Sequence, residues 1–133
     1  MPGDKPLLGA ISHIRLFAMP DDWERTVRFY RDMLGFSERY VDAEAGIAGF
    51  ECGDGPEIGI ERVDPAEVEE IEMAGRFAGV SFRVADIETA VRGLSEQGVV
   101  FDGSPQRMDW GGTLAHFRDP AGNVLTLTQY PGA

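Results

Sequence analysis

Several features that define other protein classes are missing from this 133-residue sequence. It has one cysteine, Cys52, so no disulfide can form within the chain, which is typical of the reducing cytoplasm. No apolar run approaches the roughly 20 residues that cross a bilayer. The opening residues, MPGDKPLLGA, also lack the pattern of a secretory signal. We therefore expect a cytoplasmic protein that does not enter the membrane.

Basic residues are also scarce. Lys and Arg number 12 against 23 Asp and Glu, which gives a net charge of −11. A general nucleic-acid binder needs a basic face, so this balance argues against nucleic acid as a partner. Many acidic residues gather in residues 63–75, a segment that reads as a solvated linker or helix face. The alternative is that its field attracts cationic ligands.

The first half of the chain carries a strand, a helix and three further strands. Residues 11–18 alternate, with Ile14 and Leu16 on one face and His13 and Arg15 on the other. Residues 20–35 have a helical apolar stripe that includes Trp23 and Tyr30, which predicts that both side chains are core. Strands are then predicted at 36–42, 46–52 and 56–63, separated by turn residues.

The same order recurs in the second half. Residues 79–84 alternate, residues 86–98 read as a helix, and strands are predicted at 99–103, 112–118 and 123–130. We predict an α+β fold of two βαβββ modules forming a cupped mixed sheet with helices on the outer face. The predicted parts are an N-terminal extension (1–9), a first module (10–63), an acidic linker (64–77) and a second module (78–130).

Such a module leaves one sheet face without a helix. In the first strand the helix covers the face of Ile14 and Leu16, so the face of His13 and Arg15 needs another partner. A curved sheet that faces its duplicate would enclose a hollow lined by this second face. Small-molecule sites favour such concave places, so the sequence predicts a site there.

Two stretches carry a resemblance to a known family. Residues 12–36, SHIRLFAMPDDWERTVRFYRDMLGF, and residues 110–129, WGGTLAHFRDPAGNVLTLTQ, resemble the glyoxalase, bleomycin-resistance protein and extradiol dioxygenase superfamily, also called the vicinal oxygen chelate fold. The resemblance covers about residues 10 to 130. It implies paired βαβββ modules in a cupped sheet, usually in a homodimer.

The resemblance also implies four positions for metal ligands. They fall on His13, Gly59, Gly79 and Thr126, so one strong ligand is present where metal-using members have four. Threonine is a weak ligand and glycine offers no side chain. We therefore expect no metal cofactor. The alternative is a divalent metal ion held by a different set, His13, Glu61 and His116.

Strand parity places further residues on the predicted inner face. An arginine there needs a carboxylate, Glu57 or Glu61, or an anionic ligand. Trp110 is predicted at the mouth, where it could stack on a planar ligand or a cation; the alternative is that it packs under its own loop. Arg118, beside the turn, is predicted to reach solvent. The predicted ligand cavity comprises His13, Arg15, Phe17, Gly59, Glu61, Ser81, Arg83, Trp110, His116, Thr126 and Thr128.

Three functions are compatible with these residues. The first is a binding protein of the bleomycin-resistance type, which holds a small organic molecule without metal. The second is an enzyme, a lyase, isomerase or dioxygenase that uses His13, His116 and Glu61, with or without a metal. The third is a regulatory or accessory domain without turnover. The sequence does not name the ligand, and fold alone does not choose among the three.

Overall fold

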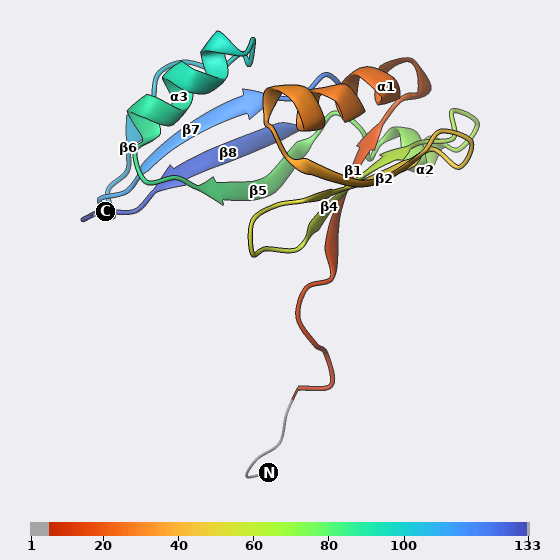
Figure 1. Ribbon diagram of the computed structural model, residues 1–133, viewed down its shortest axis with the longest axis horizontal. Coiled ribbons are helices and arrows are strands. Elements are labelled where there is room, and N and C mark those ends of the chain that lie inside the picture. The colour runs from red at the N-terminus through yellow and green to blue at the C-terminus, as the bar shows by residue number, and fades with distance from the viewer. Residues whose placement is uncertain (1–5, 133) are drawn as a thin grey trace.

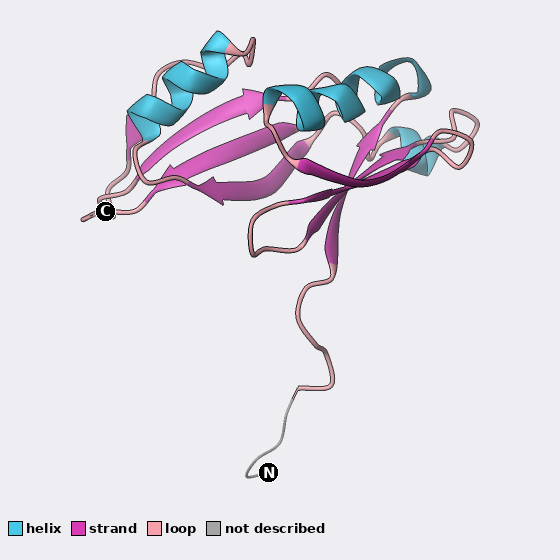
Figure 2. Cartoon of the chain, in the orientation of Figure 1, coloured by secondary structure: helices cyan, strands magenta, loops and turns pink. Residues whose placement is uncertain are grey.

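The computed structural model describes residues 6–132. Two modules follow each other along the chain (Figures 1 and 2). The first contains β1 (His13–Ala18), α1 (Pro20–Arg28), the π-helical turn η1 (Phe29–Met33), β2 (Ser37–Asp42), β3 (Ile47–Glu51) and β4 (Glu57–Arg62). After α2 (Val68–Ile71), the second contains β5 (Phe77–Arg83), α3 (Ile87–Glu96), β6 (Gln106–Arg107), β7 (Thr113–Arg118) and β8 (Val124–Gln129).

Each module builds its own four-stranded mixed sheet. The first sheet has the order β1-β4-β3-β2, and the second has the matching order β5-β8-β7-β6. In each sheet the first strand, β1 or β5, lies at the edge and runs parallel to its neighbour, β4 or β8. Helices α1 and α3 lie on the same side of the two sheets (Figure 1). The α+β class and the duplicated modules are thereby confirmed. We call the sheet face opposite the helices the open face.

The core lies between the helices and the sheets. Trp23 and Tyr30 on the helical stripe are buried as predicted, and the Trp23 indole N–H donates to the Ile60 carbonyl at 3.1 Å. The ring of Phe29 packs against Phe117 of the second sheet with centroids 6.3 Å apart. The core is therefore shared between the modules. Within residues 6–132, no helix has both the length and the apolar character needed to cross a membrane.

One predicted strand is wrong. Residues 99–103 form only an isolated bridge between Phe101 and Phe117, and the strand beside β7 is the two-residue β6. Val99 and Phe101 pack into the core instead, which explains the apolar signal there without a strand. The predicted linker holds the short helix α2, and β5 begins at Phe77, the last residue of that range.

The turn between β7 and β8 joins the two modules. Asp119 is buried and accepts a hydrogen bond from the Tyr30 hydroxyl of the first module at 2.8 Å. Asn123 is also buried; its amide N–H donates to the Phe17 carbonyl of β1 at 3.0 Å, and its amide oxygen accepts from the Gly75 N–H at 3.0 Å. We call this set, Tyr30, Asp119 and Asn123, the inter-module clamp.

The inter-module clamp contains the buried carboxyl group of Asp119, and removing this group from water costs free energy. Burial raises the pKa of Asp119, and hydrogen bonds from Asn123 and Tyr30 limit that rise. Burial and the neighbouring Asp119 together raise the pKa of the Tyr30 hydroxyl well above its ordinary value. Each group depends on the other, because a buried polar atom that loses its partner bears the full cost of its desolvation.

We predict that Tyr30→Phe lowers the free energy of unfolding by about 1–3 kcal/mol, because Asp119 loses one of its donors in a buried site. Chemical denaturation measures this. The matched control is Tyr40→Phe, because Tyr40 is exposed and its hydroxyl bonds to Glu57 at 3.0 Å on the open face. Equal effects of the two substitutions would contradict a buried clamp.

Candidate functional site

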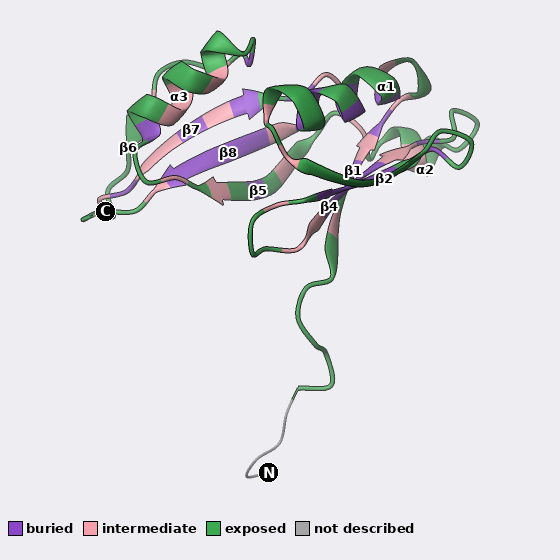
Figure 3. Cartoon of the chain, in the orientation of Figure 1, coloured by how far each residue is buried: buried purple, intermediate pink, exposed green. Residues whose placement is uncertain are grey.

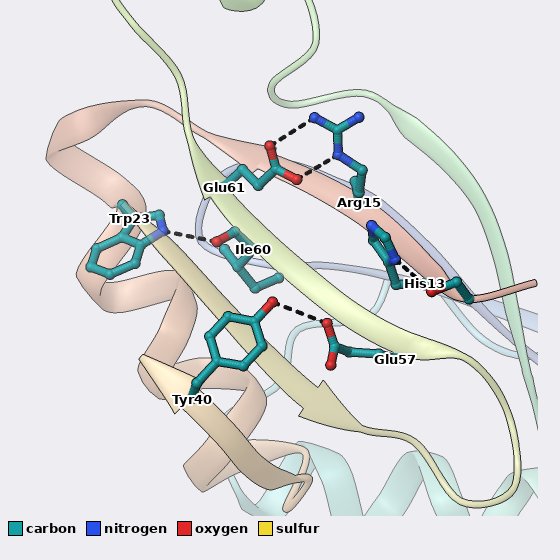
Figure 4. A network of polar contacts seen from close by, with 8 residues as sticks. His13, Arg15, Trp23, Tyr40, Glu57, Ile60 and Glu61 are labelled. Atoms are coloured by element: carbon teal, nitrogen blue, oxygen red, sulfur yellow. Dashed lines mark hydrogen bonds and ion pairs between the residues drawn. The ribbon is translucent and has the colours of Figure 1, made fainter. Parts of the chain in front are cut away.

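The open face of the first sheet is polar. Arg15 pairs with Glu61 through Nε···Oε2 and Nη2···Oε1 distances of 2.5 and 2.9 Å, so Glu61 is the carboxylate that neutralises this arginine (Figure 4). The Tyr40 hydroxyl donates to Glu57 (Figure 4). His13 is exposed at the start of β1, where its Nδ1 lies 3.0 Å from the Ser12 hydroxyl.

Two glycines face each other in the middle of this sheet. Gly59 pairs with Arg15 on one side and with Gly49 on the other. The Tyr40 ring lies across Gly49, where an added Cβ would come within 2.5 Å of it. At Gly59 an added Cβ would meet nothing closer than 3.7 Å. The open face therefore has room for a side chain above Gly59.

The open face of the second sheet is built from two rows that run across β5, β8 and β7. One row is Ser81, Thr126 and His116, and the next contains Arg83, Thr128 and Leu114. Both threonines are buried between their larger neighbours. Thr126 meets the Nδ1 of His116 at 2.8 Å, so the threonine orients the imidazole. The predicted residues of this module therefore share the open face. Thr126 and Thr128 lie at its base, because larger side chains bury them.

Exposed aromatic rings surround these rows. Phe77 is 66% exposed and meets His116 edge-on, with ring centroids 6.3 Å apart. Trp110 is 51% exposed and packs against Tyr130, with centroids 5.9 Å apart. The Arg83 guanidinium lies 4.3 Å from the centre of the Tyr130 ring. We call Phe77, Arg83, Trp110, His116 and Tyr130 the aromatic face.

Two other predicted residues lie at the edges of these faces. The Phe17 ring lies under the Arg15 guanidinium, 5.5 Å from its centroid, on the open face of β1. Arg118 is exposed, as expected for a residue beside the turn, and its Nε lies 3.4 Å from Asp102. Neither residue adds a strong metal ligand to the site.

The four positions that metal-using relatives supply do not form a donor set here. His13 is the one imidazole among them, Thr126 is committed to His116, and Gly59 has no side chain. Gly79 adopts a φ of +70°, in the left-handed region, at a register shift between Phe77 and Ser81. An L-residue with a ligating side chain would be strained at this position. These residues do not fit the metal of the family.

The alternative ligand set is not assembled either. Within residues 6–132, no three His, Cys, Asp or Glu side chains come together in a way that could hold a metal ion. His13, Glu61 and His116 each have a separate neighbour, which is Ser12, Arg15 and Thr126 respectively. Their predicted grouping as a triad is not seen in this chain.

A groove of about 770 Å³ lies between the modules. Its lining comes from both, and includes Ile14, Leu34, Phe36, Cys52, Phe82 and Leu94. We call it the inter-module groove. Among the predicted cavity residues, only Ser81 and Arg83 line it. The groove and the aromatic face therefore meet at β5 but are largely different surfaces.

Sequence reasoning missed three residues of the open faces. Tyr130 continues the alternation of Thr126 and Thr128, so strand parity could have identified it. Phe77 falls in the range assigned to the linker. Tyr40 follows an irregularity in the pairing of β2 between Glu38 and Tyr40, which shifts the alternation along that strand.

The fold and the open faces define a class, the duplicated βαβββ proteins whose sheets present a face free of helices. Residues 10–127 match the family model described as Glyoxalase/Bleomycin resistance protein/Dioxygenase superfamily. The chain belongs to this superfamily, and the resemblance seen in the sequence is confirmed.

Individual relatives agree with this assignment. "Uncharacterized protein YraH" of Bacillus subtilis is 28% identical over 122 residues, which cover 86% of this chain and 94% of that protein. A superfamily member from Sphaerobacter thermophilus has a TM-score of 0.77 at 23% identity, covering 94% of this chain and all of the other. TnmS3, described as an antibiotic binding protein from Streptomyces, has a TM-score of 0.73 at 24% identity, covering 94% and 98%. The structural matches establish the fold.

Gly59 and Gly79 occupy two of the family's metal-ligand positions, and we predict that their replacement by alanine changes the free energy of unfolding in different ways. Gly59→Ala should leave the free energy of unfolding unchanged or raise it by up to about 1 kcal/mol, because the site has space and the unfolded chain loses freedom. Gly79→Ala should lower it by about 1–2 kcal/mol because of its positive φ. Chemical denaturation of the two variants tests the pair. If Gly79→Ala left the free energy of unfolding unchanged, the backbone at position 79 would not be strained by a side chain.

Proposed function

We propose that this protein binds a small, planar organic molecule on its aromatic face, without a metal ion. The observation that carries the proposal is the exposure of Trp110 and Tyr130 beside Arg83, with Phe77 beside His116 farther along the same sheet face. Apolar rings exposed together on a soluble domain usually mark a binding surface. Rings of this kind stack on flat ligands, and Arg83 supplies a cation at the edge.

The polar groups of the site suit recognition. His116 is held by Thr126 and offers its other ring nitrogen, which has no hydrogen-bond partner within residues 6–132. Arg83 likewise has no carboxylate partner in that part of the chain, whereas Arg15 is neutralised by Glu61. This difference favours a ligand with an anionic or electron-rich group over a strongly cationic one. The antibiotic-binding description of TnmS3 suggests antibiotics as one ligand class to test.

The absence of a suitable donor set supports metal-independent binding. The family's metal positions hold two glycines and a threonine, and none of these competes with imidazole or carboxylate for a transition metal. The homodimer implied by the resemblance is part of this proposal. In a dimer, the polar face of one sheet could complete the site with its Arg15–Glu61 pair.

We predict that anthraquinone-2-sulfonate, a planar anionic probe, quenches tryptophan fluorescence saturably, because Trp110 is exposed and Trp23 is buried. By calorimetry, Trp110→Ala should weaken binding about tenfold, which corresponds to about 1.4 kcal/mol of lost stacking. Val100→Ala, an exposed residue outside the site, is the control. Binding should persist in EDTA. A requirement for added divalent metal would defeat the proposal.

Turnover is the second candidate, favoured by the fixed orientation of His116. An imidazole held through Nδ1 is arranged as a general base would be, with Nε2 left for a substrate. If the bound molecule is also converted, His116→Gln should abolish product formation while fluorescence quenching by the same molecule remains. Quenching with no product for any bound compound would leave binding as the function.

A further inference from the structure

One edge of β5 lies open beside the inter-module groove. Among the described strands, β5 is at the edge of the second sheet and pairs with β8 alone. Most residues of β5 are exposed or half-buried, whereas β8 beside it is buried along most of its length (Figure 3). The groove is lined by four consecutive residues of β5, 80–83. An occupant of the groove therefore meets the free edge of a strand.

The backbone groups along this edge alternate in direction. The Val84 N–H donates to the Thr128 carbonyl of β8 at 2.9 Å, and Arg83 lies in register with Thr128. Successive residues of a strand direct their N–H and C=O groups to opposite sides, so Phe82 and Val84 bond to β8 while Ser81 and Arg83 face the groove. Within residues 6–132, neither Ser81 nor Arg83 makes a backbone hydrogen bond on that side.

The walls of the groove are apolar and come from both modules. Phe36 of the first module and Phe82 of the second meet there, with ring centroids 5.6 Å apart. Ile14, Leu34 and Leu94 line the same groove and are half-buried. An occupant that covers these side chains removes apolar surface from water, which favours binding.

The charge and size of the groove select a small, uncharged occupant. Among the described residues, Asp54 and Arg83 are the charged members of the lining, so their charges balance in a chain whose net charge is −11. The volume of about 770 Å³ lies in the range of about 300–1,000 Å³ that is typical of small-molecule sites. Two edge residues are also too short a strip for a protein interface, which buries at least about 1,000 Å².

We propose that the inter-module groove binds a short, uncharged, apolar peptide that pairs with the free edge of β5. In the antiparallel direction, which gives the more stable pairing, two opposed residues exchange both of their N–H···O bonds. Because Ser81 and Arg83 are two positions apart, the first and third residues of an extended tripeptide reach both, and the N–H of its second residue points away. The side chains of the peptide cover Phe36, Phe82 and Leu94.

This site is distinct from the aromatic face. The groove uses the backbone of Arg83, whereas the aromatic face uses its side chain beside Tyr130. The two sites also take different ligands, since one favours an uncharged peptide and the other a planar molecule with an anionic or electron-rich group. Either proposal can therefore fail without the other.

Cys52 reports on the groove, because the single cysteine of the chain is part of its lining. The probe is the blocked tripeptide acetyl-Leu-Val-Leu-amide, and mass spectrometry follows alkylation of Cys52 by N-ethylmaleimide. Saturating tripeptide should slow alkylation about tenfold, because an occupied groove shields the thiol. N-methylation of the first or third residue removes a donor to β5 and should weaken protection about tenfold. N-methylation of the second residue is the matched control and should leave protection unchanged.

Three outcomes of this experiment overturn the proposal. The first is an absence of protection by the unmodified tripeptide. The second is equal protection by all three N-methylated forms, which would mean that β5 forms no hydrogen bonds to the peptide. The third is protection that rises with protein concentration and not with tripeptide, which would assign the groove to a second copy of the chain.

A substitution in the groove wall gives an independent measurement. By calorimetry, Leu94→Gln should raise the Kd of the tripeptide about tenfold, because a polar group replaces an apolar wall. The control is Val91→Gln on the same helix, where the side chain is also half-buried but lies outside the lining. Both variants should keep the circular dichroism of the wild type and the quenching by anthraquinone-2-sulfonate. Equal Kd values for the two variants would contradict binding in the groove.

Discussion

The buried hydrogen bond between Tyr30 and Asp119 links two modules whose sheets share no strand pairing within residues 6–132. Asn123 adds bonds to β1 and to the segment before β5, so one turn fixes both modules and the connection between them. Phe29 packs on Phe117 beside this polar set, and the two kinds of contact reinforce each other. Because the polar groups are directional and buried, they fix how the two modules meet, which apolar packing alone leaves loosely specified.

That fixed arrangement leaves each sheet with a different exposed chemistry. The first sheet pairs its charges internally, as in Arg15 and Glu61, while the second presents rings around an oriented imidazole. The two modules therefore keep one strand order while their exposed side chains differ. Metal-using members of the superfamily place four ligands on such faces, whereas the corresponding positions here are His13, Gly59, Gly79 and Thr126.

Much of the fold was readable from local patterns. Strand alternation and helical spacing predicted both modules. The apolar stripe of residues 20–35 predicted that Trp23 and Tyr30 are buried. The site was only partly readable. Parity identified His116 and Arg83, but an irregular pairing in β2 concealed Tyr40, and Phe77 lay in the range assigned to the linker. The bond from Tyr30 to Asp119 spans 89 residues, and no local period encodes it. The strand predicted at 99–103 failed because its apolar residues serve the core directly.

The left-handed backbone at Gly79 also bears on how this protein can evolve. A mutation that introduced histidine there would arrive in a backbone that resists it, and would bring no benefit while Gly59 and Thr126 stay as they are. Several changes would have to accumulate, in a favourable order, before any of them was selected. The backbone at Gly79 therefore sets a barrier on any path toward a ligating side chain at that position.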